Sequence, residues 1–102
     1  MFINDDYTIT NTLLEYVVMG NNPNGKSYTL TLPPIFGSHY PDQFSSKISD
    51  VQTIIIHNIS DQTQTIRPSA NNYIYKQSES LRLESMKVAV LKTVGNTWFN
   101  VL

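Results

Sequence analysis

Apolar and polar residues alternate along most of the chain, in short runs that end at proline, glycine or asparagine. Ser27 to Leu32 shows this most clearly, with Tyr28, Leu30 and Leu32 on one face. A period of two is typical of a strand with one buried side, and such runs recur about every 8–12 residues. We therefore predict an all-β fold: a single antiparallel β-sandwich or barrel-like domain of about eight strands that spans residues 1–102.

The alternation is interrupted near the N-terminus. Residues 7–10 alternate regularly, but the phase slips by one residue at Leu13-Leu14. After the slip, Leu14, Tyr16 and Val18 share a face. Because a slip of one residue moves every following side chain to the opposite side, it indicates either a bulge or a crossing from one sheet to another.

One run is apolar without alternation. Ile54-Ile55-Ile56 lies within an otherwise strand-like stretch from Gln52 to Ile59. A continuous apolar run is typical of a strand that is buried on both faces. The sequence thus places this strand either at the centre of the domain or beneath a contact between subunits.

Turn signals divide these runs. Gly95-Asn96 is the strongest hairpin signal, because glycine adopts a positive φ without steric cost. Pro33-Pro34 ends a strand, since proline cannot donate to a sheet. Residues 35–51 are the least regular part, in which we expect one helical turn from Asp42 to Lys47. A long connection of this kind is often functional.

The composition supports the prediction of a β fold and excludes several kinds of partner and site. Val, Ile and Thr total 27 residues against two alanines, a bias that disfavours helix. The 35 Ser, Thr, Asn and Gln residues outnumber the 15 charged ones, so neutral polar groups provide most of the polar surface. With a net charge of −1 we expect no nucleic-acid or membrane partner. The absence of cysteine excludes disulfides and cysteine-based zinc sites.

Titratable residues show no catalytic or metal-binding pattern. His39 and His57 are 18 residues apart, and no carboxylate stands at metal-ligand spacing from them. We interpret His57 as a strand-face histidine hydrogen-bonded to a neighbour, and His39 as a loop residue. The carboxylates fall mostly at turns, and no pair suggests a glycosidase. We predict a non-enzymatic chain with no metal and no cofactor.

Two sequence features concern modification and export. Asn58-Ile59-Ser60 matches a glycosylation sequon. Met1 is followed by Phe-Ile-Asn-Asp-Asp rather than by a basic and then an apolar stretch, so we expect no signal peptide. The sequon therefore carries little weight.

Aromatic residues provide candidate contact surfaces. Phe36, Tyr40 and Phe44 lie in the irregular segment, where an exposed apolar cluster would mark a partner site. Trp98 is expected to anchor either the core or a subunit interface. The tyrosines either cap the core with their hydroxyls in water or stack on sugars or on a protein, so a surface glycan is an alternative ligand.

The order of features from Tyr28 to Leu102 is familiar. Thr-Leu-Thr-Leu-Pro-Pro leads into the irregular segment, followed by Thr-Ile-Ile-Ile-His-Asn-Ile-Ser and Gln-Thr-Ile-Arg-Pro. Tyr-Ile-Tyr, Ser-Leu-Arg-Leu and Val-Gly-Asn-Thr-Trp-Phe come next. This order resembles the small β-modules of tailed-bacteriophage virion proteins, found in tail and head fibres and in capsid decoration proteins. It departs from them at Asn71-Asn72, where glycines are common, and in its long aromatic loop.

The resemblance implies a structural protein of the virion, often a homotrimer. Within that class we expect a capsid decoration or cement protein, or the base of a head fibre, that bridges subunits of the major capsid protein. Residues 27–102 would form the β-module. Residues 1–26 would supply a first strand and a docking segment, which adds a strand to a sheet edge of the shell. A glycan-recognising fibre or adhesin module and a tail or baseplate adaptor are the alternatives.

The residues predicted at partner interfaces are Phe2, Ile3, Phe36, Tyr40, Phe44, Ile54, Ile56 and Trp98.

Overall fold

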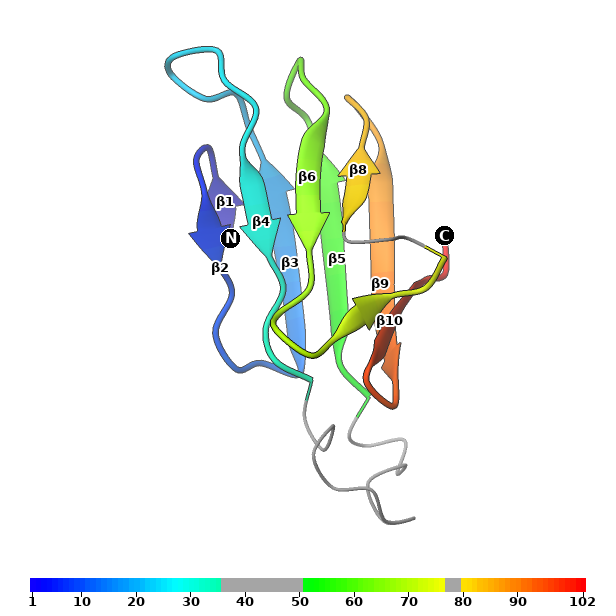
Figure 1. The fold of residues 1–102 in the computed structure, drawn as a ribbon. Helices are drawn as coiled ribbons and strands as arrows, with labels where there is room; N and C mark the ends of the chain where they lie inside the picture. Colours follow the sequence, from blue (N-terminus) through cyan, green and yellow to red (C-terminus); the bar gives the residue numbers. More distant parts are fainter. Residues whose placement is uncertain (36–50, 77–79) are drawn as a thin grey trace.

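A computed structural model describes residues 1–35, 51–76 and 80–102, which carry ten strands in two sheets and no helix (Figure 1). The six-stranded sheet has the order β1 (Phe2–Ile3), β3 (Leu14–Met19), β5 (Thr53–Asn58), β9 (Val88–Val94), β10 (Thr97–Asn100) and β7 (Tyr73–Ile74). The four-stranded sheet has the order β2 (Tyr7–Thr8), β4 (Thr29–Thr31), β6 (Gln64–Arg67) and β8 (Leu81–Leu83). The prediction of a mostly-β fold is confirmed. Within the described ranges there is no helix that could span a membrane.

The first six strands alternate between the two sheets. Strands β1, β3 and β5 enter the six-stranded sheet in the same direction and pair in parallel, as do β2, β4 and β6 in the other sheet. Five of the eight described pairings are parallel. The prediction of an antiparallel domain is therefore wrong. Successive strands lie in different sheets, so the strand that returns to a sheet runs parallel to its predecessor there.

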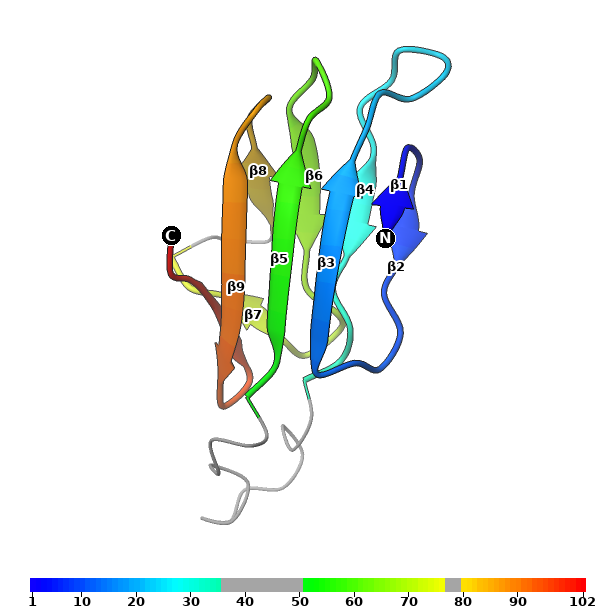
Figure 2. The same ribbon diagram turned by 180° about the vertical axis from the view of Figure 1, so that it is seen from behind.

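The two sheets lie face to face, as Figures 1 and 2 show from opposite sides, and their inner side chains form one apolar core. The face predicted from Tyr28, Leu30 and Leu32 is buried as expected. In β5, Ile54 and Ile56 have no exposed surface, whereas Ile55 points to the other side of the sheet and is half-buried. Burial of each of these isoleucine side chains stabilises the folded state by about 1.5–3 kcal/mol relative to leaving it exposed.

Trp98 on β10 is fully buried, so the core alternative predicted for it is confirmed. Its indole Nε1 has no hydrogen-bond partner among the described residues. Leaving a buried donor unpaired costs about 1–3 kcal/mol, so the ring stabilises the core by packing alone.

The phase slip at Leu13-Leu14 marks a crossing between sheets. Strand β2, before the slip, belongs to the four-stranded sheet, and β3, after it, belongs to the six-stranded sheet. Ile9 begins the connection, with its N–H donating to the carbonyl of Thr31 and its side chain in the core. The crossing, one of the two alternatives drawn from the sequence, is confirmed.

The hairpin predicted at Gly95-Asn96 joins β9 to β10. Val94 pairs with Thr97 across the turn, and Gly95 has a φ of 62°. A side chain at this φ is strained, which explains the glycine. The helical turn expected from Asp42 to Lys47 lies outside the described residues.

The N-terminus is built into the six-stranded sheet. The Met1 amino group donates to the carbonyl of Tyr16 at 2.8 Å, and Val18 N–H donates to the carbonyl of Met1 at 2.8 Å. Ile3 lies in the core, while the ring of Phe2 lies against Gly20. A Cβ built at residue 20 would clash with the tip of the Phe2 ring, so a larger residue there would displace this exposed ring.

Candidate functional site

The outward side of the six-stranded sheet carries a continuous set of apolar side chains on β1, β3, β5 and β9. Strand register arranges them in rows across the sheet. The middle row consists of Tyr16, Ile55 and Val90. The row on one side contains Phe2, Val18, His57 and Val88, and the row on the other contains Leu14, Thr53, Lys92 and Phe99. We call the surface formed by Phe2, Leu14, Tyr16, Val18, Ile55, Val88 and Val90 the outer apolar face; the strands that carry it, β1, β3, β5 and β9, face the viewer in Figure 2.

Much of the outer apolar face is open to water. Leu14 is 66% exposed, Phe2 61% and Tyr16 47%, and the remaining members are half-buried by their neighbours in the sheet. Strands β3, β5 and β9 have six or seven residues each and β1 has two; at a spacing of about 4.8 Å and a rise of about 3.3 Å per residue they give a surface of roughly 330 Å². The largest apolar patch on a folded chain is typically about 300–600 Å² and is often functional.

The outward side of the four-stranded sheet has the opposite character. Thr8, Thr31 and Arg67 form one row across it, and Thr29, Thr65 and Arg82 form the next. Threonine hydroxyls and guanidinium groups are well solvated. This surface, which we call the threonine face, is therefore suited to water, and only the six-stranded sheet presents an apolar exterior.

The outer apolar face contains few charges. His57 and Lys92 are the only titratable groups among the outward side chains of β1, β3, β5 and β9, apart from the phenol of Tyr16. Lys92 Nζ donates to Thr53 Oγ1 at 3.1 Å, at one end of the face. His57 lies on the strand face, as predicted, between Val18 and Val88, and the described residues provide no hydrogen bond to its imidazole.

The structure separates the residues predicted at interfaces. Ile3, Ile54, Ile56 and Trp98 are 0–7% exposed and belong to the core, so they cannot touch a partner in this conformation. That part of the prediction is corrected, because alternation along a strand sends every second apolar residue inward. Phe2 alone among the described members of that set is on the surface. Phe36, Tyr40 and Phe44 lie outside the described residues, as does His39.

The candidate contact residues that the sequence analysis did not predict are the outward neighbours of these core residues. Ile55 sits between Ile54 and Ile56, and Val88 and Val90 flank the buried Ala89. The signal was present: a strand with one solvated side should show polar residues at these positions, and both strands show aliphatic ones.

A buried polar cluster lies between the sheets at the end of β5. Asn58 Nδ2 donates to the carbonyls of Gln62 and Leu83, at 2.8 and 2.9 Å. Asn58 Oδ1 accepts from the N–H and hydroxyl of Ser60, and Gln64 Nε2 donates to Ser60 Oγ at 2.9 Å. Asn58, Ser60 and Gln64 have no exposed surface. The asparagine of the sequon is therefore buried, and its hydrogen bonds connect the two sheets.

Tyr28 links the two sheets from the opposite side. Its hydroxyl donates to the carbonyl of Gly20 at 2.5 Å, with the carbonyl of Ile3 3.3 Å away. Burial, helped by the charge of Asp5, raises the pKa of Tyr28 to about 12. A phenol held this way is a structural hydrogen-bond donor.

A second surface feature is a polar hollow of about 560 Å³ that overlaps the threonine face, since Thr29, Thr65 and Arg67 line it. Its lining includes Thr65, Arg67, Ser69, Asn71, Tyr73 and Ser80. Tyr73 is 57% exposed. An exposed ring among hydroxyl, amide and guanidinium groups suits a hydroxyl-rich ligand.

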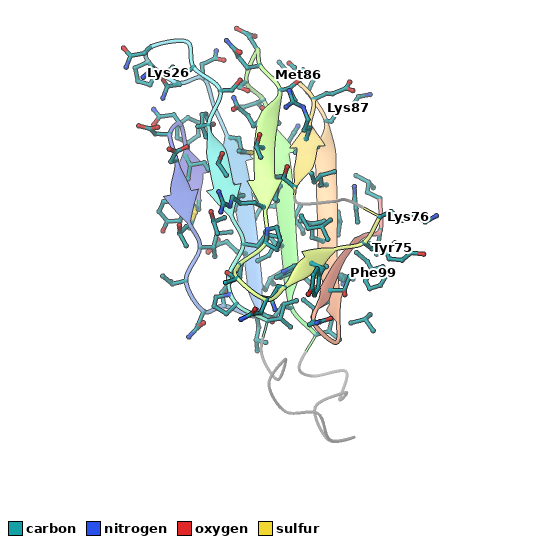
Figure 3. The ribbon with its side chains drawn as sticks, viewed as in Figure 1. Lys26, Tyr75, Lys76, Met86, Lys87 and Phe99 are labelled. Atoms are coloured by element: carbon teal, nitrogen blue, oxygen red, sulfur yellow. The ribbon has the colours of Figure 1, made fainter. Side chains whose placement is uncertain are left out.

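An aromatic pair stands at the margin of the six-stranded sheet. Tyr75 and Phe99 stack with ring centroids 4.8 Å apart, and Lys76 Nζ lies 5.5 Å from the Tyr75 ring (Figure 3). Within residues 1–35, 51–76 and 80–102, no group of three or more histidines and carboxylates could hold a metal ion. Among described features, the outer apolar face is the strongest candidate for a functional surface.

Comparison of the chain with protein-family models, with curated proteins and with solved structures gave no match.

Proposed function

We propose that the chain is a non-enzymatic structural protein of a tailed-bacteriophage virion, most consistent with a capsid decoration or cement protein or a head-fibre base. Two arguments support the proposal. The order of motifs from Tyr28 to Leu102 resembles virion β-modules. The outer apolar face provides the kind of surface through which a structural protein acts, and this observation carries the proposal.

The two face-to-face sheets fit the β-sandwich that the family would have, in which opposed inner faces share one core. A small domain gains stability when a second apolar face is covered in an assembly. A shell protein without disulfides would use such contacts in their place. Bridging neighbouring capsid subunits would add contact area that resists shell expansion.

The N-terminal edge is the proposed attachment point to the shell. Strand β1 is an edge strand of the six-stranded sheet, and Phe2 is exposed beside it. A strand from a capsid protein could pair with the free edge of β1. Deletion of residues 1–6 would also remove the core residue Ile3, so Phe2→Ala is the cleaner test: we expect weaker binding to shells and an unchanged fold.

The proposed function is tested by counting the chain in purified particles with quantitative mass spectrometry. A copy number comparable to that of the major capsid protein supports decoration. A number matching one tail ring supports the tail or baseplate adaptor instead. Particles that lack the chain altogether, although infected cells produce it, would overturn a virion function.

The polar hollow favours the second candidate, a glycan-recognising fibre or adhesin module. A glycan array separates the two: sharp binding that disappears in Tyr73→Ala and Arg67→Ala, but persists in Tyr16→Ala on the opposite side, supports recognition. Tyr40→Ala belongs in the same array because Tyr40 is a tyrosine of the predicted partner cluster and tyrosines can stack on sugars.

A further inference from the structure

We propose that the outer apolar face is covered by further copies of the same chain. This inference deepens the proposed function by naming the partner of that face. It begins from the chemistry of the middle row, Tyr16, Ile55 and Val90, which runs across three adjacent strands without a charge. Apolar sheet faces in proteins are covered by other apolar faces about 10 Å away.

Charge favours a like partner. The outward side chains of β1, β3, β5 and β9 include no carboxylate and only two basic groups. A copy laid on this face meets uncharged side chains across the middle row, so association carries no like-charge repulsion there. Lys92 lies at one end of the face, where its ammonium can stay in water while Thr53 accepts its hydrogen bond.

Size also fits. With the four residues of β10 and the exposed terminal residues Val101 and Leu102, the surface grows to roughly 430 Å² by the same strand spacings. Two such faces would bury roughly 850 Å² in total, which is the size of a weak or transient contact. We therefore expect a weak, concentration-dependent oligomer with micromolar affinity.

The threonine face supplies the matched control. Ile55 and Thr65 are both half-buried residues at the centre of their strands, each pointing outward from its own sheet. A lysine at either position adds one charge and a long side chain to an outer face. Only Ile55→Lys places that charge on the proposed interface.

The test is sedimentation equilibrium of the purified chain over about 1–100 μM, the micromolar range expected for an interface of this size. We expect oligomers for the natural chain and for Thr65→Lys, and monomers for Ile55→Lys with unchanged circular dichroism. A natural chain that stays monomeric throughout overturns the inference. So does a folded Ile55→Lys chain that associates like the natural one.

If Ile55→Lys fails to fold, Leu14→Ser decides the question. Leu14 is 66% exposed, so its replacement leaves the monomer folded. We expect its dissociation constant to rise about tenfold; no change would overturn the inference. Because these measurements use no virion, their failure leaves the proposed function untouched, and the particle count can fail without affecting them.

Discussion

The two outer faces of this protein differ although the two sheets share one core. The threonine face ends in hydroxyl and guanidinium groups, while the outer apolar face repeats the aliphatic chemistry of the interior. Folding of a single chain explains only the inner faces. The outward apolar rows do not pack in the core, and they expose apolar surface to water. Their presence therefore suggests a contact with another molecule.

The largest expected effect is a difference in stability between mutations on the inner and outer sides of β5. Ile56→Ala removes a fully buried side chain and should lower the free energy of unfolding by roughly 2–5 kcal/mol. Ile55→Ala, measured in urea at a protein concentration where the chain is monomeric, should cost less than about 1.5 kcal/mol. Equal costs at the two positions would contradict the assignment of Ile55 to an outer face.

The polar cluster between the sheets gives the next effect. Asn58→Ala leaves the carbonyls of Gln62 and Leu83 without their donor and should cost roughly 2–4 kcal/mol in urea unfolding. Asn11→Ala, at an exposed position, is the control and should change stability by less than about 0.5 kcal/mol. A cost at Asn58 no larger than at Asn11 would show that the cluster does not join the sheets.

The raised pKa of Tyr28 predicts that the folded chain loses stability at alkaline pH. The pKa rises from 10.0 to about 12 on folding, so the folded chain keeps the phenolic proton after the unfolded chain has released it. Stability is therefore intact below pH 10 and falls as the pH approaches 12, by roughly 2–3 kcal/mol in total. Urea unfolding at several alkaline pH values measures this. Tyr28→Phe should lack this component; the same decline in that variant would assign it to another group.

The smallest effect comes from exchanging the chemistry of the two faces. Val18→Thr and Thr31→Val are nearly isosteric changes at half-buried outward positions on β3 and β4. Because both positions lie on outer faces and not in the core, each change should alter monomer stability by less than about 1 kcal/mol in urea unfolding. In sedimentation, Val18→Thr should weaken self-association and Thr31→Val should leave it unchanged. The reverse ranking would place the interface on the threonine face.

Sequence reasoning predicted the local structure better than its arrangement. The alternation around Leu30 and the glycine at residue 95 located strands and a hairpin, because these signals depend on the nearest residues. The parallel pairing was missed, since it depends on which sheet each crossing reaches. Burial of Ile54 and Ile56 was anticipated, but the outward residue that we propose for an interface is Ile55 between them. The Asn58 cluster gave no signal, because Leu83 and Gln64 join it only after folding.

The crossing of the chain between sheets sets the order in which the fold can be completed. Strand β5 finds its antiparallel neighbour in β9, and β6 finds its own in β8, both in the last quarter of the sequence. Neighbours so distant along the chain give a high contact order, which slows folding. During translation, β6 would keep one side unpaired until β8 leaves the ribosome, and β5 would do so until the C-terminal hairpin of β9 and β10 follows.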